Sequence, residues 1–168
     1  MLTNLIAGSG LLGSCLDMIR DMQDVNQRRI AVREQLWREA GFNADVLKLL
    51  SGTRITPEQR LRALQFEVTA AVLKLPLPME EFLAPQLSKD ATALLVASPP
   101  GRDGRYQHWV AGIMSEQDLL ERVWLRYAIA DVRIRAGVGR ADLDYLRLLI
   151  RALATTLRPE AGSKAASC

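Results

Sequence analysis

The stretch SEQDLLERVWLRYAIADVRIRAGVGRADLDYLRLLIRALATTLR, residues 115–158, decides the fold. Apolar residues recur at spacings of three and four on both sides of Gly137-Val138-Gly139, a pattern typical of two amphipathic helices separated by a turn. Ser115, followed three residues later by Asp118, resembles a capping box and predicts the start of the first helix. Two apolar faces of this length are unstable in water, so the pair is predicted to anchor a helical core. The apolar positions are Leu119, Val123, Tyr127, Ala130 and Ile134, then Leu143, Leu146, Ile150, Leu153 and Leu157.

The composition agrees with a helical domain. The chain has 168 residues, of which 49% are hydrophobic and 24% charged, as in an ordinary soluble protein. Only 5% are aromatic, so the core is aliphatic, which favours helices over a β-sandwich. We therefore predict a mostly α fold: a single-domain bundle of five to seven helices over residues 1–158, followed by a disordered tail over residues 159–168.

Further helices are expected in the first half of the chain. A charged segment before residue 41 has a thin apolar face, and Gly41 is a typical residue for a helix to end at. A short helix over residues 44–50 follows. Thr56-Pro57-Glu58 combines an N-cap, a first-position proline and an acid, so it predicts a helix start, with an apolar face that continues to Leu75.

The middle of the chain allows two interpretations. Ser88 can cap a helix over residues 89–97, yet residues 93–97 form an apolar run that a buried strand would also show. Residues 106–110 alternate enough for a minor β-hairpin near residues 93–110. We favour a helix, a loop and then a short extended piece.

Residues 1–16 carry no charged side chain and also allow two interpretations. As a helix, the segment places small residues four apart, Ser9 with Gly13 and Gly10 with Ser14, so that another helix or a second copy of the chain can approach closely. As a strand, turn and helix, Gly8, Gly10 and Gly13 match the G-x-G-x-x-G fingerprint of NAD(P)-binding proteins, with residues 29–33 as the next strand. The later chain does not alternate short strands with helices, which counts against the second interpretation.

No constellation of residues predicts catalysis, a metal or a cofactor. His108 is the only histidine, and a triad or zinc site would need partners that the sequence does not supply nearby. The two cysteines, Cys15 and Cys168, cannot form a disulfide framework, which favours a reducing compartment. No secretory signal is evident, and no apolar run is long enough for a spanning helix. A cytoplasmic, bacterial protein is the expectation.

The strongest surface signal is a pair of arginine stripes. At about 100° per residue, the arginines of each predicted C-terminal helix gather on one side of it, and most have no acid one turn away. They are Arg122, Arg126 and Arg133 on the first helix, and Arg140, Arg147, Arg151 and Arg158 on the second. A solvated face is the plainest interpretation, a docking surface for an acidic protein is the sharper one, and nucleic-acid binding comes third. A net charge of +3 is low for a nucleic-acid binder.

These observations predict a non-enzymatic protein–protein interaction protein, such as an adaptor, chaperone, inhibitor or assembly subunit. It would dock its partner through the apolar segment containing Ser9, Gly10 and Gly13, through the arginine stripes, or through both, and would form a homo- or hetero-oligomer. If the two helices packed side by side, the stripes would merge into one patch. An NAD(P)-binding protein is the competing class, and a nucleic-acid-binding protein is the third.

Overall fold

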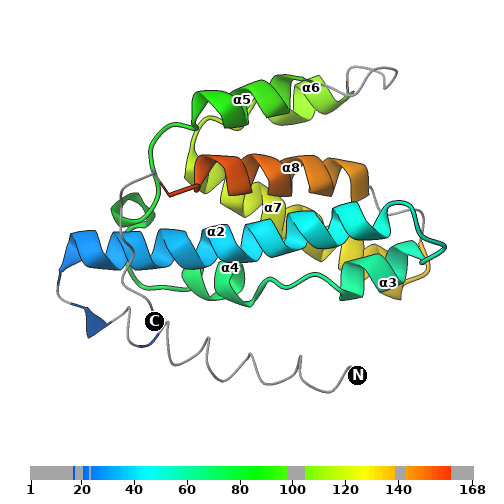
Figure 1. The fold of residues 1–168 in the computed structure, drawn as a ribbon, viewed down its shortest axis with the longest axis horizontal. Coiled ribbons are helices and arrows are strands. Elements are labelled where there is room, and N and C mark those ends of the chain that lie inside the picture. Colours follow the sequence, from blue (N-terminus) through cyan, green and yellow to red (C-terminus); the bar gives the residue numbers. More distant parts are fainter. Residues whose placement is uncertain (1–16, 18–20, 23, 98–104, 139–142, 160–168) are drawn as a thin grey trace.

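A computed structural model describes residues 17, 21–22, 24–97, 105–138 and 143–159 (Figure 1). Within these residues the chain forms α-helices, one short 3-10 helix and no strand, which confirms the mostly α prediction. Of the segment near residues 93–110 that allowed a hairpin, residues 93–96 and 105–110 are helical. The short extended piece expected at residues 106–110 is therefore wrong. The elements are α2 (Val25–Leu50), α3 (Pro57–Arg62), α4 (Glu67–Val72), η1 (Met79–Glu81), α5 (Lys89–Val96), α6 (Arg105–Val110), α7 (Glu116–Arg135) and α8 (Leu143–Thr156).

Helix α8 is the centre of the bundle. It packs against α2, α5 and α7, and Figure 1 shows it running between the α5–α6 layer and α2. Because neighbours cover it on three sides, α8 buries more than the single predicted stripe. Its buried side chains are Tyr145, Leu146, Leu149, Ile150, Ala152, Leu153 and Thr156, and Leu157 is buried just beyond its end. The predicted stripe of α7 is also confirmed: Leu119, Val123 and Ala130 are buried, and Tyr127 and Ile134 pack at the edge of the core.

The prediction that a helix ends at Gly41 is wrong. Helix α2 continues through Gly41 to Leu50, a length of about 39 Å at 1.5 Å per residue. A glycine inside a helix costs about 1 kcal/mol relative to alanine. Tertiary packing outweighs this cost, because Leu36, Ala40 and Leu47 lie buried on both sides of the glycine.

The single helix predicted from Thr56 to Leu75 is also wrong, because it divides into α3 and α4. Two buried polar side chains of α2 hold the connection between them. The Asn43 side chain accepts a hydrogen bond from the Gln65 N–H (2.8 Å) and donates one to the carbonyl of the same residue. The Glu39 carboxylate accepts hydrogen bonds from the N–H groups of Val68 (2.7 Å) and Thr69 (2.9 Å), and from the Thr69 hydroxyl (2.6 Å). It thus satisfies the otherwise unpaired donors at the start of α4.

Helix starts are the best-predicted boundaries. Ser115 and Asp118 form the expected reciprocal capping box at the start of α7. Thr56 caps α3 through the N–H of Gln59, whose side chain accepts from the Thr56 N–H. Ser88 caps α5 through the N–H of Ala91. All three depend on hydrogen bonds between residues three apart, which is why they are readable without the tertiary structure.

An ion pair between a buried carboxylate and a partly exposed guanidinium joins three helices and a loop. The Glu116 carboxylate, 2% exposed, forms a bidentate pair with the Arg33 guanidinium of α2. It also accepts hydrogen bonds from the Ala84 N–H (2.7 Å) and the Thr156 hydroxyl (3.0 Å). Arg33 donates in addition to the carbonyl of Thr156, at the end of α8. Every oxygen of the buried carboxylate is therefore hydrogen-bonded, the condition under which a buried charge is tolerated.

No helix within the described residues is both long enough and apolar enough to span a membrane.

Candidate partner-binding groove

A groove runs along the surface between α2 and α8. It consists of two adjoining hollows of about 490 and 330 Å³ that share Ala44, Asp45 and Arg151. We call the two together the α2–α8 groove. The first hollow is lined by Trp37, Arg38, Gly41, Ala44, Asp45, Leu94, Arg151, Ala154, Thr155 and Arg158, and the second adds Lys48 and Arg147.

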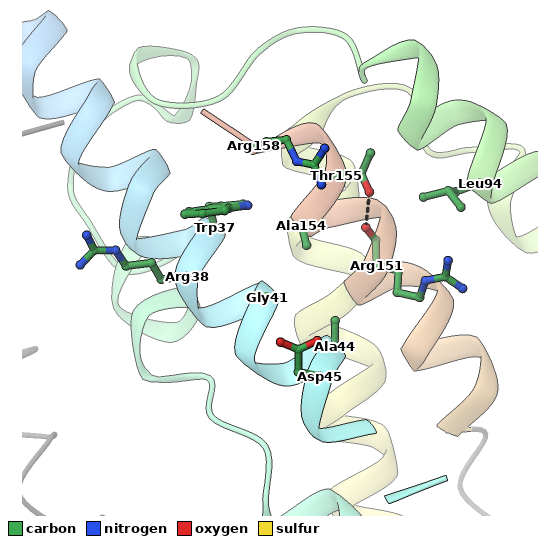
Figure 2. A pocket seen from close by; sticks show the side chains of 10 residues that line it. All are labelled: Trp37, Arg38, Gly41, Ala44, Asp45, Leu94, Arg151, Ala154, Thr155 and Arg158. Atoms are coloured by element: carbon green, nitrogen blue, oxygen red, sulfur yellow. Dashed lines mark hydrogen bonds between the residues drawn. The ribbon is translucent and has the colours of Figure 1, made fainter. Parts of the chain in front are cut away.

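Apolar side chains line part of the first hollow. Figure 2 shows the Trp37 indole projecting from α2 toward α8, with Ala154 facing it across the groove and Leu94 of α5 beyond α8. Trp37 and Ala154 are partly buried and pack at the edge of the core. The Thr155 hydroxyl donates to the Arg151 carbonyl at 2.8 Å, so it is already satisfied within α8. Around Trp37 and Ala154 the groove therefore offers an aromatic face and a small side chain.

The rim of the groove is positively charged. Arg147 and Arg151 come from α8, Arg158 lies just beyond the C-terminal end of α8, and Lys48 comes from α2. Within the part of the chain that the structure describes, none of these four cations forms an ion pair with a carboxylate. Asp45 is the one acid in the lining.

Arg38 contributes less to this charge than the other lining cations do. Its guanidinium is paired with Glu34, one turn earlier on α2. Figure 2 shows the Arg38 side chain extending away from α8, so only its stem borders the groove. The free positive charge is consequently concentrated on the α8 side and at Lys48.

The α7 arginines lie elsewhere and are partly engaged. The Arg126 guanidinium stacks on two aromatic rings, 4.8 Å from the centre of Trp109 and 5.0 Å from that of Tyr145. Arg122 lies close enough to Asp118 to contribute to the lowered pKa of that carboxyl, although hydrogen bonding with Ser115 is the larger cause. Arg133 is exposed on α7. None of the three lines the α2–α8 groove, so the structure does not bring the two predicted stripes together there.

Several predicted site residues lie outside the described residues. These are Ser9, Gly10 and Gly13 of the apolar segment, Gly8 of the fingerprint, and Arg140; the predicted tail from residue 160 onward is outside them as well. The proposed second strand of the dinucleotide fold, residues 29–33, is described and is helical, as part of α2. That part of the NAD(P) interpretation is therefore wrong.

No metal-binding cluster is found among the described residues. They contain no group of three or more His, Cys, Asp or Glu side chains placed to hold a metal. His108 is exposed on α6. The most perturbed carboxyl, Glu39, has its pKa raised to about 7 by burial, against the opposing effect of the hydrogen bonds that it accepts from Thr69 and Val68. Because it lies inside the bundle, we assign it to the fold.

Sequence reasoning missed the α2 side of the groove. Trp37 and Lys48 are ordinary members of a charged amphipathic helix, and nothing in their local pattern marks them. They become a site only because α2 packs against α8, about one hundred residues later in the chain. No protein-family model, curated protein or solved structure matches the chain.

Proposed function

We propose that this protein is a non-enzymatic interaction protein that docks an acidic partner protein in the α2–α8 groove. The observation that carries the proposal is the charge of the rim: Arg147, Arg151, Arg158 and Lys48 border one groove without an ion pair among the described residues. A partner carboxylate would meet an arginine fork there in the geometry that suits bidentate hydrogen bonds.

The alternative of a purely solvated charged face predicts cations spread over convex surface. The concentration of four of them around a groove with an aromatic residue in its floor favours docking instead, because tryptophan and arginine are the residues that most often dominate binding interfaces. Nucleic-acid binding would use the same cations. Its base-stacking mode usually needs aromatic side chains interleaved with the cations, and Trp37 is the only aromatic residue in the lining.

The test is a quantitative affinity capture from the source cell with matched bait proteins. The wild-type chain is compared with Arg151→Glu, which reverses a charge in the groove, and with Arg133→Glu, which makes the same charge change on α7. We expect a partner that the wild type and Arg133→Glu retain equally and that Arg151→Glu loses by about fivefold or more, the effect of an interaction contributing over about 1 kcal/mol.

Two further measurements separate the competing classes. Titration of the purified protein with NAD(H) and NADP(H) should give no saturable signal. Binding to a DNA duplex should be weak and should disappear at physiological salt, as non-specific phosphate contacts do. Equal loss of the partner from both charge reversals would reject the groove as the docking site, and saturable nucleotide binding would favour the NAD(P) class.

A further inference from the structure

Gly41 departs from helix propensity, and the packing of the bundle does not explain this departure. It lies in the interior of α2, where alanine would be more stable by about 1 kcal/mol. Glycine is required where φ is positive or where a Cβ would collide. Gly41 does not have a positive φ, and a Cβ built there meets no atom within 4 Å. The helix thus keeps a glycine without a packing reason.

The empty space beside Gly41 belongs to the α2–α8 groove, which Gly41 itself lines. Trp37 stands one turn before it on the same helix, and Ala154 faces it from α8 (Figure 2). When a residue beside a surface site departs from the propensity of its helix, a functional reason for the departure is expected. The missing side chain leaves room for a group of the occupant to approach the α2 backbone.

We infer that the occupant of the groove is an acidic peptide segment that inserts one apolar side chain between Trp37, Gly41 and Ala154 and presents carboxylates to Arg151 and Arg158. This inference rests on the proposed function, and it specifies the kind of segment that binds. The apolar side chain would be sealed from water by the indole and the helix backbones. The flanking carboxylates would lie on the cationic rim, where the arginines provide fork-like donors.

The groove also sets the length of the segment. Arg147 and Thr156, the last residue of α8, are nine residues apart, so this part of the rim extends about 14 Å along the helix axis, with Arg158 just beyond it. About four extended residues or about nine helical residues cover that length. Asp45 lies where the two hollows meet, and its carboxylate disfavours an acid at that position of the segment.

The experiment is a selection from a phage library displaying random peptides of about twelve residues, long enough to cover the rim in either conformation. The full-length protein is the target, and selected peptides are synthesised for binding measurements. Gly41→Leu fills the space without changing any charge, and leucine is a better helix former than glycine. Gly112→Leu is the matched control, because Gly112 also has open space around its Cβ position and does not line the groove. Circular dichroism and thermal unfolding verify that both variants are folded.

We expect selected peptides to share an apolar residue flanked by Asp or Glu. They should bind at least tenfold more weakly to Gly41→Leu and to Arg151→Glu, and with unchanged affinity to Gly112→Leu and Arg133→Glu. Acidic peptides that bind Gly41→Leu as tightly as the wild type would overturn the inserted side chain but leave the acidic-partner function standing. Four results would each overturn the inference. The selected peptides could be non-acidic, or their binding could be insensitive to Arg151→Glu. A DNA oligonucleotide could displace them at physiological salt, or the selection could yield no peptide. The affinity capture with Arg151→Glu and Arg133→Glu tests the proposed function separately, because it measures retention of the cellular partner.

Discussion

Glu39 should make the stability of the protein fall as the pH rises through the neutral range. Its carboxyl is 8% exposed, and burial raises its pKa from 4.5 to about 7 in the folded state. Between these two values the folded protein binds a proton that the unfolded chain has released, so stability decreases with increasing pH. The contribution is fully present below pH 4.5 and is lost as the pH rises through about 7.

The magnitude follows from the interval between the two pKa values. At about 1.4 kcal/mol for each pH unit, the shift from 4.5 to about 7 corresponds to about 3 kcal/mol, of which about 2.5 kcal/mol falls between pH 5 and pH 8. For a chain of this size, that is a change in melting temperature of roughly 5–10 °C. The charged form above pH 7 is held by the hydrogen bonds from Val68 and Thr69, so we expect destabilisation rather than unfolding.

The assay is urea denaturation of the wild type and of Glu39→Gln at several values from pH 5 to pH 8. Other titrating groups are shared by the two proteins, so the difference in their unfolding free energies isolates Glu39. The advantage of the wild type over the variant should shrink by about 2.5 kcal/mol across this range. In Thr69→Val, which lacks the hydroxyl donor that favours the carboxylate, the decline with pH should be larger. A difference that is flat, or that grows with pH, would refute the reasoning, because it would mean that the hydrogen bonds outweigh burial.

Two further changes test the packing of the bundle. Arg33→Leu leaves the Glu116 carboxylate buried without its cation, and we expect the free energy of unfolding to fall by about 3–5 kcal/mol in chemical denaturation; a loss below about 1 kcal/mol would show that the carboxylate is not buried as described. Gly41→Ala should raise the free energy of unfolding by about 0.5–1 kcal/mol, because the Cβ meets nothing and the unfolded chain loses freedom. A destabilised Gly41→Ala would contradict the open space beside α2.

Features that depend on neighbouring residues were predictable from sequence. Ser115 with Asp118, and Thr56 with Pro57, define helix starts through contacts within one turn, and the structure has both. The apolar stripes of α7 and α8 were predictable because helical periodicity is itself local. The course of the chain after Arg62 was not, because the break between α3 and α4 is held by Glu39 and Asn43 from a different helix.

The candidate site likewise combines residues that could be predicted from the sequence with residues that could not. Arg147, Arg151 and Arg158 could be grouped from their spacing, and they do lie along one groove. The other wall could not be predicted, because Trp37 and Lys48 reach it through packing between helices distant in sequence. The sequence alone predicts a helix end at Gly41, because that is the usual role of glycine after an apolar face. Only the tertiary structure shows that the helix continues and that the glycine faces the groove.

The position of Thr156 in the ion-pair network has a consequence during synthesis. Arg33 and Glu116 leave the ribosome well before the last turn of α8, whose Thr156 hydroxyl and carbonyl complete their hydrogen bonds. Until that turn emerges, the nascent chain contains a charged pair that cannot be buried with all its partners, and the apolar faces of α2 and α7 lack the helix that covers them. The native bundle therefore forms only after residue 156 has left the ribosome, and shorter nascent chains leave the apolar faces of α2 and α7 without their partner helix.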